Sequence, residues 1–257
     1  MKKIIMLFLL TVFAAWTLVG CSGSVIVAEK GSAGEKVAQA LEGYEYTAVD
    51  SQNKALMEVM SGTADAAIVD YVLTIGSIGE GTDFAGLQVS GDGYAPESYG
   101  IAFRKGSDVT ARVNEAIAQL KDSGRLAEIA RKYKLEGQLT ADESFEAPTE
   151  AGENSDWAYI QQKGELVIGI TYFAPMNYLD AEGQLVGFET EFATAVCEML
   201  GVKPRFEVIN WGSKEMELNS KTIDCIWNGM TIDEDKKETM SLTIPYMQNK
   251  QVMIVKR

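Results

Sequence analysis

Histidine is absent from the 257 residues of this chain. Its absence excludes Ser/His/Asp and Cys/His nucleophile systems and every metal site built on imidazole. Paired carboxylates could still perform acid–base chemistry, because burial can separate the pKa values of two acidic side chains. Basic residues are also scarce, since 23 Lys and Arg stand against 37 Asp and Glu and give a formal net charge of -14. Such a surface repels phosphate backbones, which makes nucleic acid a poor candidate partner.

Cysteine is nearly absent as well, with three in the whole chain. Cys21 lies at the end of an apolar leader, whereas Cys197 and Cys225 lie in apolar segments that we expect to form a helix and a strand. A disulfide needs a particular Cα spacing that a sequence alone does not supply. We therefore expect Cys197 and Cys225 to be buried free thiols.

The leader itself has the order of a secretory signal. Lys2 and Lys3 precede an apolar run over residues 4–19, and a small residue, Gly20, precedes Cys21. This order resembles a bacterial lipoprotein signal with its lipobox, which implies that residues 1–21 form the signal and that Cys21 is lipidated. Acyl chains, at about 0.8 kcal/mol per buried methylene, would then anchor the protein on the extracytoplasmic face of the cell membrane. The alternative is an uncleaved membrane anchor, for which the run is short.

Beyond the leader, the pattern predicts an α/β fold. Apolar runs typical of buried strands alternate with segments of helical spacing, and this alternation indicates parallel sheets covered by helices. The expected strands are 25–28, 44–49, 66–69, 99–103, 166–170, 206–209 and 251–255, and the expected helices are 34–41, 53–60, 107–135 with a break at Gly124, and 189–200. Residues 136–156 are rich in acidic residues and poor in apolar ones, which is typical of a solvated linker.

One internal repeat indicates two related lobes. The stretch MEVMSGTADA at residues 57–66 aligns without gaps to MELNSKTIDC at residues 216–225. Each copy is predicted to be the end of a helix, a polar turn and a buried strand. The alternative is chance similarity between elements of the same kind.

Several motifs taken together resemble the polar amino-acid-binding proteins of bacterial ABC importers. They are GSAGE at 31–35, DAAIVD at 65–70, GFE at 187–189 and WGSKEMELNSKTIDCIWNGMT at 211–231. The resemblance implies the type II periplasmic binding protein fold, with two Rossmann-like lobes joined by a hinge. It also implies a monomer without a cofactor, a metal or catalysis. Its expected partners are an amino acid and the permease subunits of the importer.

The order of these motifs is unusual for that family, and we expect a circular permutation. The family's second lobe would comprise residues 22–99, named the N-terminal lobe from here on. Residues 100–135 would supply a crossing strand and helices that pack on the other lobe, and 136–156 would be the linker. The family's first lobe would comprise residues 157–257, named the C-terminal lobe. With one strand near 99–103 crossing between lobes, we predict a looser hinge than is usual for the family.

The resemblance also implies a ligand site that neutralises both charges of a free amino acid. Asp70 would accept the ammonium, and the backbone N–H groups of the turn Ser32, Ala33 and Gly34 would receive the carboxylate at a helix start. Each has an ordinary alternative, because an aspartate at a strand end and a serine before a helix are often simple caps.

The opposite wall of that site would come from the C-terminal lobe. Its expected members are Phe173 or Tyr172 and Trp211 as aromatic faces, Gly229 and Thr231 as hydrogen-bonding groups, and Lys236. Lys236 stands where the family usually has an arginine, and it lacks the planar fork that grips a carboxylate. Core packing for Phe173 and an exposed loop for Lys236 are the ordinary alternatives.

These observations predict an extracytoplasmic solute-binding lipoprotein that captures a small amino acid and delivers it to an ABC importer. An enzyme of the same fold, similar to cyclohexadienyl dehydratase, is one alternative, with Glu189 or Glu191 as a general acid. A degenerate or sensor module that keeps the fold without transport is another.

Overall fold

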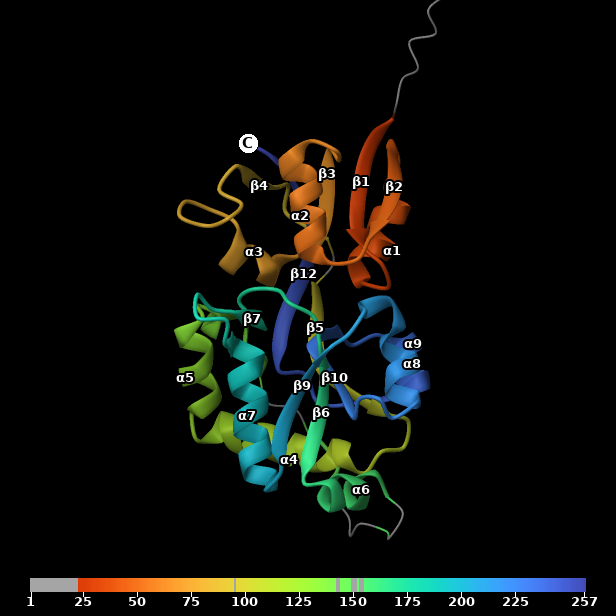
Figure 1. The fold of residues 1–257 in the computed structure, drawn as a ribbon, viewed down its shortest axis with the longest axis vertical. Coiled ribbons are helices and arrows are strands. Elements are labelled where there is room, and N and C mark those ends of the chain that lie inside the picture. Colours follow the sequence, from red (N-terminus) through yellow and green to blue (C-terminus); the bar gives the residue numbers. More distant parts are fainter. Residues whose placement is uncertain (1–22, 95, 142–143, 149–151, 153–154) are drawn as a thin grey trace, which may run out of the picture.

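The computed structural model describes residues 23–94, 96–141, 144–148, 152 and 155–257. The leader, with Cys21 and its predicted lipid anchor, lies outside the described residues. Two α/β lobes are stacked along the long axis of the molecule, and a continuous sheet runs through both (Figure 1). Within the described ranges, no helix has the length and apolar character needed to cross a membrane.

The N-terminal lobe is built on the strand order β2-β1-β3-β12, with β4 paired to β12. Strands β2 and β3 pair parallel to β1, whereas β12 is antiparallel to β3. All five residues of β3 are buried, as expected for an apolar strand between helix layers. The elements are β1 (Ser24–Glu29), α1 (Ala33–Ala40), β2 (Tyr44–Val49), α2 (Gln52–Ser61), β3 (Ala66–Asp70), α3 (Tyr71–Ser77) and β4 (Leu87–Ser90).

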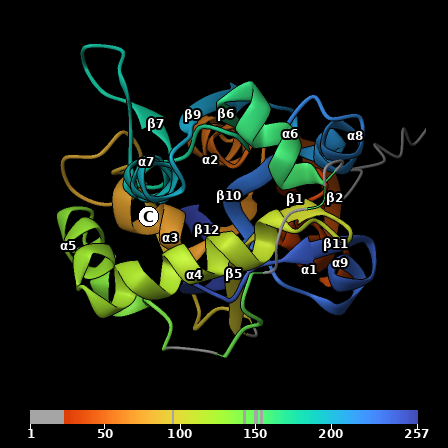
Figure 2. The same ribbon diagram turned by 90° about the horizontal axis from the view of Figure 1, so that it is seen from below.

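The C-terminal lobe continues the sheet with the order β5-β10-β6-β9 and with β11 on β5. Helix α4 lies across the end of this lobe, α5 lies at its side, and both contact α7 (Figure 1 and Figure 2). The elements are β5 (Pro96–Arg104), α4 (Val109–Asp122), α5 (Arg125–Lys132), α6 (Asp156–Lys163), β6 (Glu165–Ile170), β7 (Tyr178–Leu179), β8 (Leu185–Val186), α7 (Phe188–Leu200), β9 (Lys203–Val208), α8 (Lys214–Asn219), β10 (Cys225–Thr231), α9 (Glu234–Thr239), β11 (Met240–Leu242) and β12 (Met247–Lys256).

Two strands, β5 and β12, connect the lobes. The first four residues of β12 pair with the start of β5, and the following residues pair with β3 and β4 of the N-terminal lobe. Our expectations that one strand crosses and that residues 157–257 all belong to the C-terminal lobe are therefore wrong. The end of β12 joins the N-terminal sheet because its buried Val252 and Ile254 fill the core beside β3. The looser hinge was predicted from a single crossing strand, so the second crossing strand removes the reason for that prediction.

The internal repeat is reproduced in the hydrogen bonds of both lobes. The N–H groups of Thr63 and Thr222 donate to the carbonyls of Glu58 and Glu217 at 3.1 and 3.0 Å. In both turns a serine and a threonine hydroxyl lie 3.0 Å apart, Ser61 with Thr63 and Ser220 with Thr222. Two segments that match by chance in sequence would not share these hydrogen bonds. The two copies are therefore the same structural motif.

The predicted elements are confirmed apart from their ends, and the helices and strands that were not predicted are α3, β4, α6, β7, β8, α9 and β11. Gly124 separates α4 from α5 with a φ of 75°, as predicted. Both Cys197 and Cys225 are buried free thiols, as expected. Within the acidic segment 136–156, the described part is not purely solvated, because Phe145 packs on the core and the Thr140 N–H donates to the Tyr246 carbonyl at 3.2 Å.

Candidate functional site

A small polar pocket lies between the two lobes, at the ends of β1, β3 and β10. We call it the cleft pocket. It is lined by six residues of the N-terminal lobe and five of the C-terminal lobe, which are Glu29, Gly31, Ser32, Ala33, Gln52 and Asp70, and Trp211, Asn228, Gly229, Thr231 and Lys236. The structure thus brings together seven of the ten predicted ligand-binding residues: Asp70, Ser32, Ala33, Trp211, Gly229, Thr231 and Lys236.

The other three predicted residues do not line this pocket. Gly34 faces the sheet, where an added Cβ would lie 2.9 Å from Oε1 of Gln251. Phe173 is buried in the main hydrophobic core, as its ordinary alternative proposed. Tyr172 is exposed and lines a different cavity, beside Asn53. Aromatic type and position in the chain did not distinguish a ring that packs in the core from one that faces the cleft.

Asp70 ends β3 at the centre of the cleft pocket and is held by amide side chains. Its Oδ1 accepts hydrogen bonds from Nδ2 of Asn249 at 2.7 Å and Nε2 of Gln251 at 2.5 Å. Its Oδ2 accepts from Nε2 of Gln52, whose Oε1 accepts the Asp70 N–H at 2.8 Å. Burial raises the pKa of Asp70, and the amide hydrogen bonds oppose that rise. These neutral donors orient the carboxylate without neutralising its charge.

Two further carboxyl groups accompany Asp70. Glu29 ends β1, and Glu97 lies near the start of β5, where its Oε1 accepts from Nδ2 of Asn249 and Nε2 of Gln251 at 2.5 and 2.7 Å. Burial, followed by the charge of Asp70, raises the pKa of Glu29 to about 8 and that of Glu97 to about 7. The N-terminal wall is therefore acidic and partly protonated near neutral pH.

Two lysines lie on the opposite wall. Nζ of Lys236 is 2.8 Å from Oδ2 of Asp233, which is the N-cap of α9 and accepts the Lys236 N–H. Lys214 is buried and reaches across the cleft, where its Nζ donates to the Gly31 carbonyl at 2.9 Å and lies 4.7 Å from the centre of the Trp211 ring. Burial, followed by the charge of Lys236, lowers the pKa of Lys214 to about 8.

The turn before α1 presents its N-terminus to the cleft pocket. Oγ of Ser32 accepts the Glu35 N–H at 3.1 Å, and Oε2 of Glu35 accepts the Gly31 N–H at 2.6 Å. This reciprocal cap fixes the turn and leaves the Ala33 N–H, the first of the helix, without an intrahelical acceptor. A carboxylate beside this turn would be stabilised by that N–H and by the helix dipole.

Glu189 and Glu191, the candidate general acids, are engaged elsewhere. Oε1 of Glu189 accepts the Gly229 N–H at 2.8 Å and the Tyr246 hydroxyl, so this buried carboxyl holds the end of β10 in place. Glu191 accepts hydrogen bonds from Lys132, the last residue of α5, and from the hydroxyl of Tyr133, which follows it. Neither lines the cleft pocket.

The lobes are closed on each other. The cleft pocket has a volume of about 20 Å³, which is room for about one water molecule and far too little for an amino acid. Closure is held by contacts between lobes, including Lys214 with Gly31 and an exposed ion pair at 3.2 Å between Nζ of Lys36 and Asp235. A ligand would therefore enter an open form, and the lobes would close to an extent set by its size.

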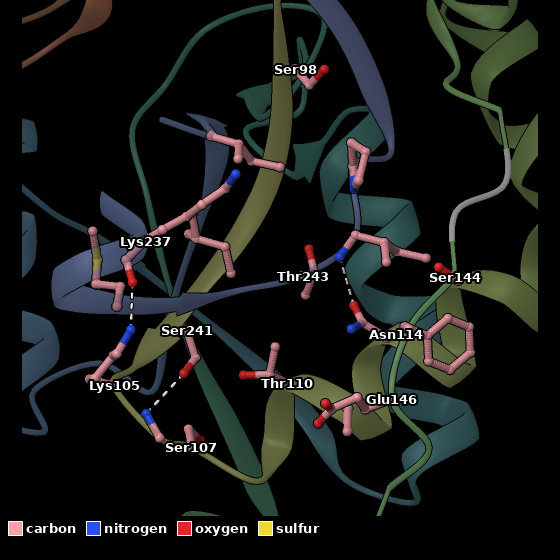
Figure 3. Close-up of a pocket in the computed structure, with 18 of the residues that line it drawn as sticks. Ser98, Lys105, Ser107, Thr110, Asn114, Ser144, Glu146, Lys237, Ser241 and Thr243 are labelled. Atoms are coloured by element: carbon pink, nitrogen blue, oxygen red, sulfur yellow. Dashed lines mark hydrogen bonds between the residues drawn. The ribbon is translucent and has the colours of Figure 1, made fainter. Parts of the chain in front are cut away.

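A larger cavity of about 960 Å³ lies outside the cleft, between β5, β11, α4 and the acidic segment (Figure 3). It is lined by polar side chains such as Lys105, Ser107, Thr110 and Asn114. It shares no lining residue with the cleft pocket.

Several cleft residues were missed from the sequence, namely Glu29, Gly31, Gln52, Asn228, and the nearby Lys214 and Glu97. A signal existed for one of them, because the offset of 159 residues between the repeats pairs Gln52 with Trp211, as it pairs Asp70 with Gly229. Extending the repeat in both directions would have identified Gln52. Glu29, Glu97 and Lys214 carried no signal, because an isolated charged residue at a strand or helix end is ordinary.

This architecture defines a class: a two-lobed α/β protein with a charged, closable pocket between its lobes. Residues 166–257 match the family of bacterial extracellular solute-binding proteins, family 3. This segment is therefore similar in sequence to that family. In the described part of the chain, no cluster of three or more His, Cys, Asp and Glu suited to a metal ion occurs.

Curated relatives agree with that match. The chain is 31% identical to the L-cystine-binding protein TcyJ of Escherichia coli over 88 residues, which cover 34% of this chain and 33% of the relative. It is 30% identical to a probable amino-acid ABC transporter-binding protein of Haemophilus influenzae over 119 residues, which cover 46% of each. A solved ABC transporter substrate-binding protein from Streptococcus pneumoniae with bound histidine is 34% identical over 34% of this chain and 36% of its own, with a TM-score of 0.33. The chain thus spans between a third and a half of the length of these relatives.

Proposed function

We propose that this protein is an extracytoplasmic solute-binding lipoprotein that captures a small amino acid in the cleft pocket and delivers it to an ABC importer. The carrying observation is the arrangement of opposite charges across one desolvated cleft. Asp70 offers a buried carboxylate on the N-terminal wall, where the α1 turn also presents a free N–H, and Lys236 offers a positive charge on the opposite wall. A zwitterion satisfies both walls, and this match strengthens when water is excluded by closure.

Ligand binding would shift the open and closed populations, because contacts with both walls exist together in the closed form alone. The permease subunits would then recognise the closed shape. We retain the circular permutation as part of this proposal, with the family's first lobe placed second along the chain. The match of the family to residues 166–257 supports it, because that segment follows the elements β1 to β4 of the N-terminal lobe here.

The contacts of Glu189 and Glu191, the two candidate general acids, argue against an enzyme. Both side chains accept hydrogen bonds from other parts of the protein, and neither lines the cleft pocket. The curated relatives that match are binding proteins. We therefore favour binding without catalysis.

The test is a thermal-shift screen of the purified protein against the common amino acids. A ligand at about 100 times its dissociation constant should stabilise the protein by roughly 2.7 kcal/mol. Asp70→Asn should abolish the shift because the ammonium loses its charged acceptor. Asp65→Asn is the matched control, since it changes an exposed aspartate of the same lobe outside the cleft and should keep the shift. Absence of any shift in the unaltered protein would favour the degenerate module.

A further inference from the structure

One carboxylate of the cleft pocket is not used by the contacts described so far. Glu29 is 3% exposed, lines the pocket, and its Oε1 has no hydrogen-bond partner among the described residues. A buried carboxylate oxygen without a donor is costly, and proteins keep such groups mainly where a ligand or ion satisfies them. Glu29 therefore points to a missing positive group on the ligand side.

The charge balance of the N-terminal wall leads to the same conclusion. Glu29 and Asp70 both line the cleft pocket, and no ion pair between described residues involves either of them. The donors to Asp70 are neutral amides. The α-ammonium of a neutral amino acid would supply one positive charge to a wall that offers two carboxyl groups.

Lys214 is the lysine whose charge acts on Glu29, where it lowers the pKa against the effect of burial. Nζ of Lys214 is engaged by the carbonyls of Gly31 and Trp211 at 2.9 and 3.2 Å, and it forms no ion pair with Glu29. Lys236 is paired with Asp233 on the opposite wall. The ring of Trp211 also lines the pocket and offers an aromatic face that favours cations.

Resting on the proposed function, we propose that the cleft selects amino acids with a cationic side chain. Asp70 binds the α-ammonium, and Glu29 binds the side-chain cation and sets this specificity. The acidic composition of the wall then serves recognition, because a desolvated carboxylate discriminates strongly against a ligand that lacks the matching charge.

The experiment compares L-arginine with L-citrulline, which has nearly the same shape but a neutral side chain. Calorimetric titration of the purified protein should give an affinity for arginine at least about tenfold higher than for citrulline. Glu29→Gln should lower the affinity for arginine by at least about tenfold while changing that for citrulline by less than about threefold. Glu45→Gln removes one exposed charge from the same lobe and should change neither.

Three outcomes would overturn the inference in different ways. Equal affinities of the unaltered protein for arginine and citrulline, with binding intact, would refute cationic selectivity and leave the proposed function standing. An equal loss for both ligands in Glu29→Gln would make Glu29 a structural residue instead of a specificity residue. Binding of no amino acid at all, in a protein with a cooperative melting transition, would refute the proposed function itself.

Discussion

The two lobes contain the same helix–turn–strand motif, but they use its last aspartate differently. In each copy Oδ2 of the aspartate accepts the N–H of a valine on the neighbouring parallel strand at 2.7 Å, Asp65 with Val25 and Asp224 with Val167. Asp65 is exposed, whereas Asp224 is buried, pairs with Lys163, and lies 3.6 Å from Nη2 of Arg104. The hydrogen bond of each aspartate is thus set within the motif itself. The burial of the aspartate and its ion pairs depend on the residues that cover the motif.

The same comparison explains how one pocket is made from two lobes. The offset that relates the motifs also relates Asp70 to Gly229 and Gln52 to Trp211, and all four line the cleft pocket. The N-terminal lobe places polar side chains at these points, and the C-terminal lobe places a ring and an open backbone. The two lobes therefore place matching positions at the pocket but fill them with different chemistry.

The largest expected effect is at the buried aspartate. Asp224→Asn should lower the free energy of unfolding by about 3 kcal/mol, because the half-buried Lys163 would lose its counter-charge and the buried Arg104 would keep Asp156 alone. Asp65→Asn, the same change in the exposed copy, should cost about 1 kcal/mol, since it weakens one hydrogen bond. Urea unfolding of both variants measures the difference. Similar losses would mean that the covering residues add nothing to the motif.

A second difference between the lobes lies on β1 and β6, the strands whose valine N–H groups donate to Asp65 and Asp224. Four residues beyond Val25 and Val167 stand Glu29 and Thr171. Because the pKa of Glu29 is raised from 4.5 to about 8, the folded state holds a proton that the unfolded state has released in this range. The free energy of unfolding should therefore fall as pH rises from 4.5 to 8, on the order of 3 kcal/mol from this group.

Glu29→Gln should remove that contribution and flatten the pH dependence of unfolding measured in urea. Glu45→Gln should keep the slope of the unaltered protein, because Glu45 is exposed on β2. Parallel curves for the unaltered protein and Glu29→Gln would show that the carboxyl is not protonated in the folded state.

The smallest expected effect is in the turn of the motif. Gly62 has a φ of 86° and the matching Lys221 a φ of 63°, so a lysine occupies the left-handed region that favours glycine. Gly62→Ala should cost about 1 kcal/mol, and Lys221→Gly should gain about 0.5 kcal/mol after loss of the lysine contact with the Tyr159 ring. Thermal and urea unfolding check both. A loss of stability in Lys221→Gly would mean that the lysine contacts outweigh the backbone strain.

The sequence by itself determined the α/β elements, the internal repeat, the buried thiols and seven residues of the cleft pocket. These depend on local periodicity and on motifs that stay together along the chain. Tertiary structure alone decided which residues face the cleft, because Glu29, Lys214 and Phe173 are ordinary in sequence and acquire their surroundings from the opposite lobe or the core. It also decided the course of β12, because pairing with β3 and β4 depends on strands that lie more than 150 residues earlier in the chain.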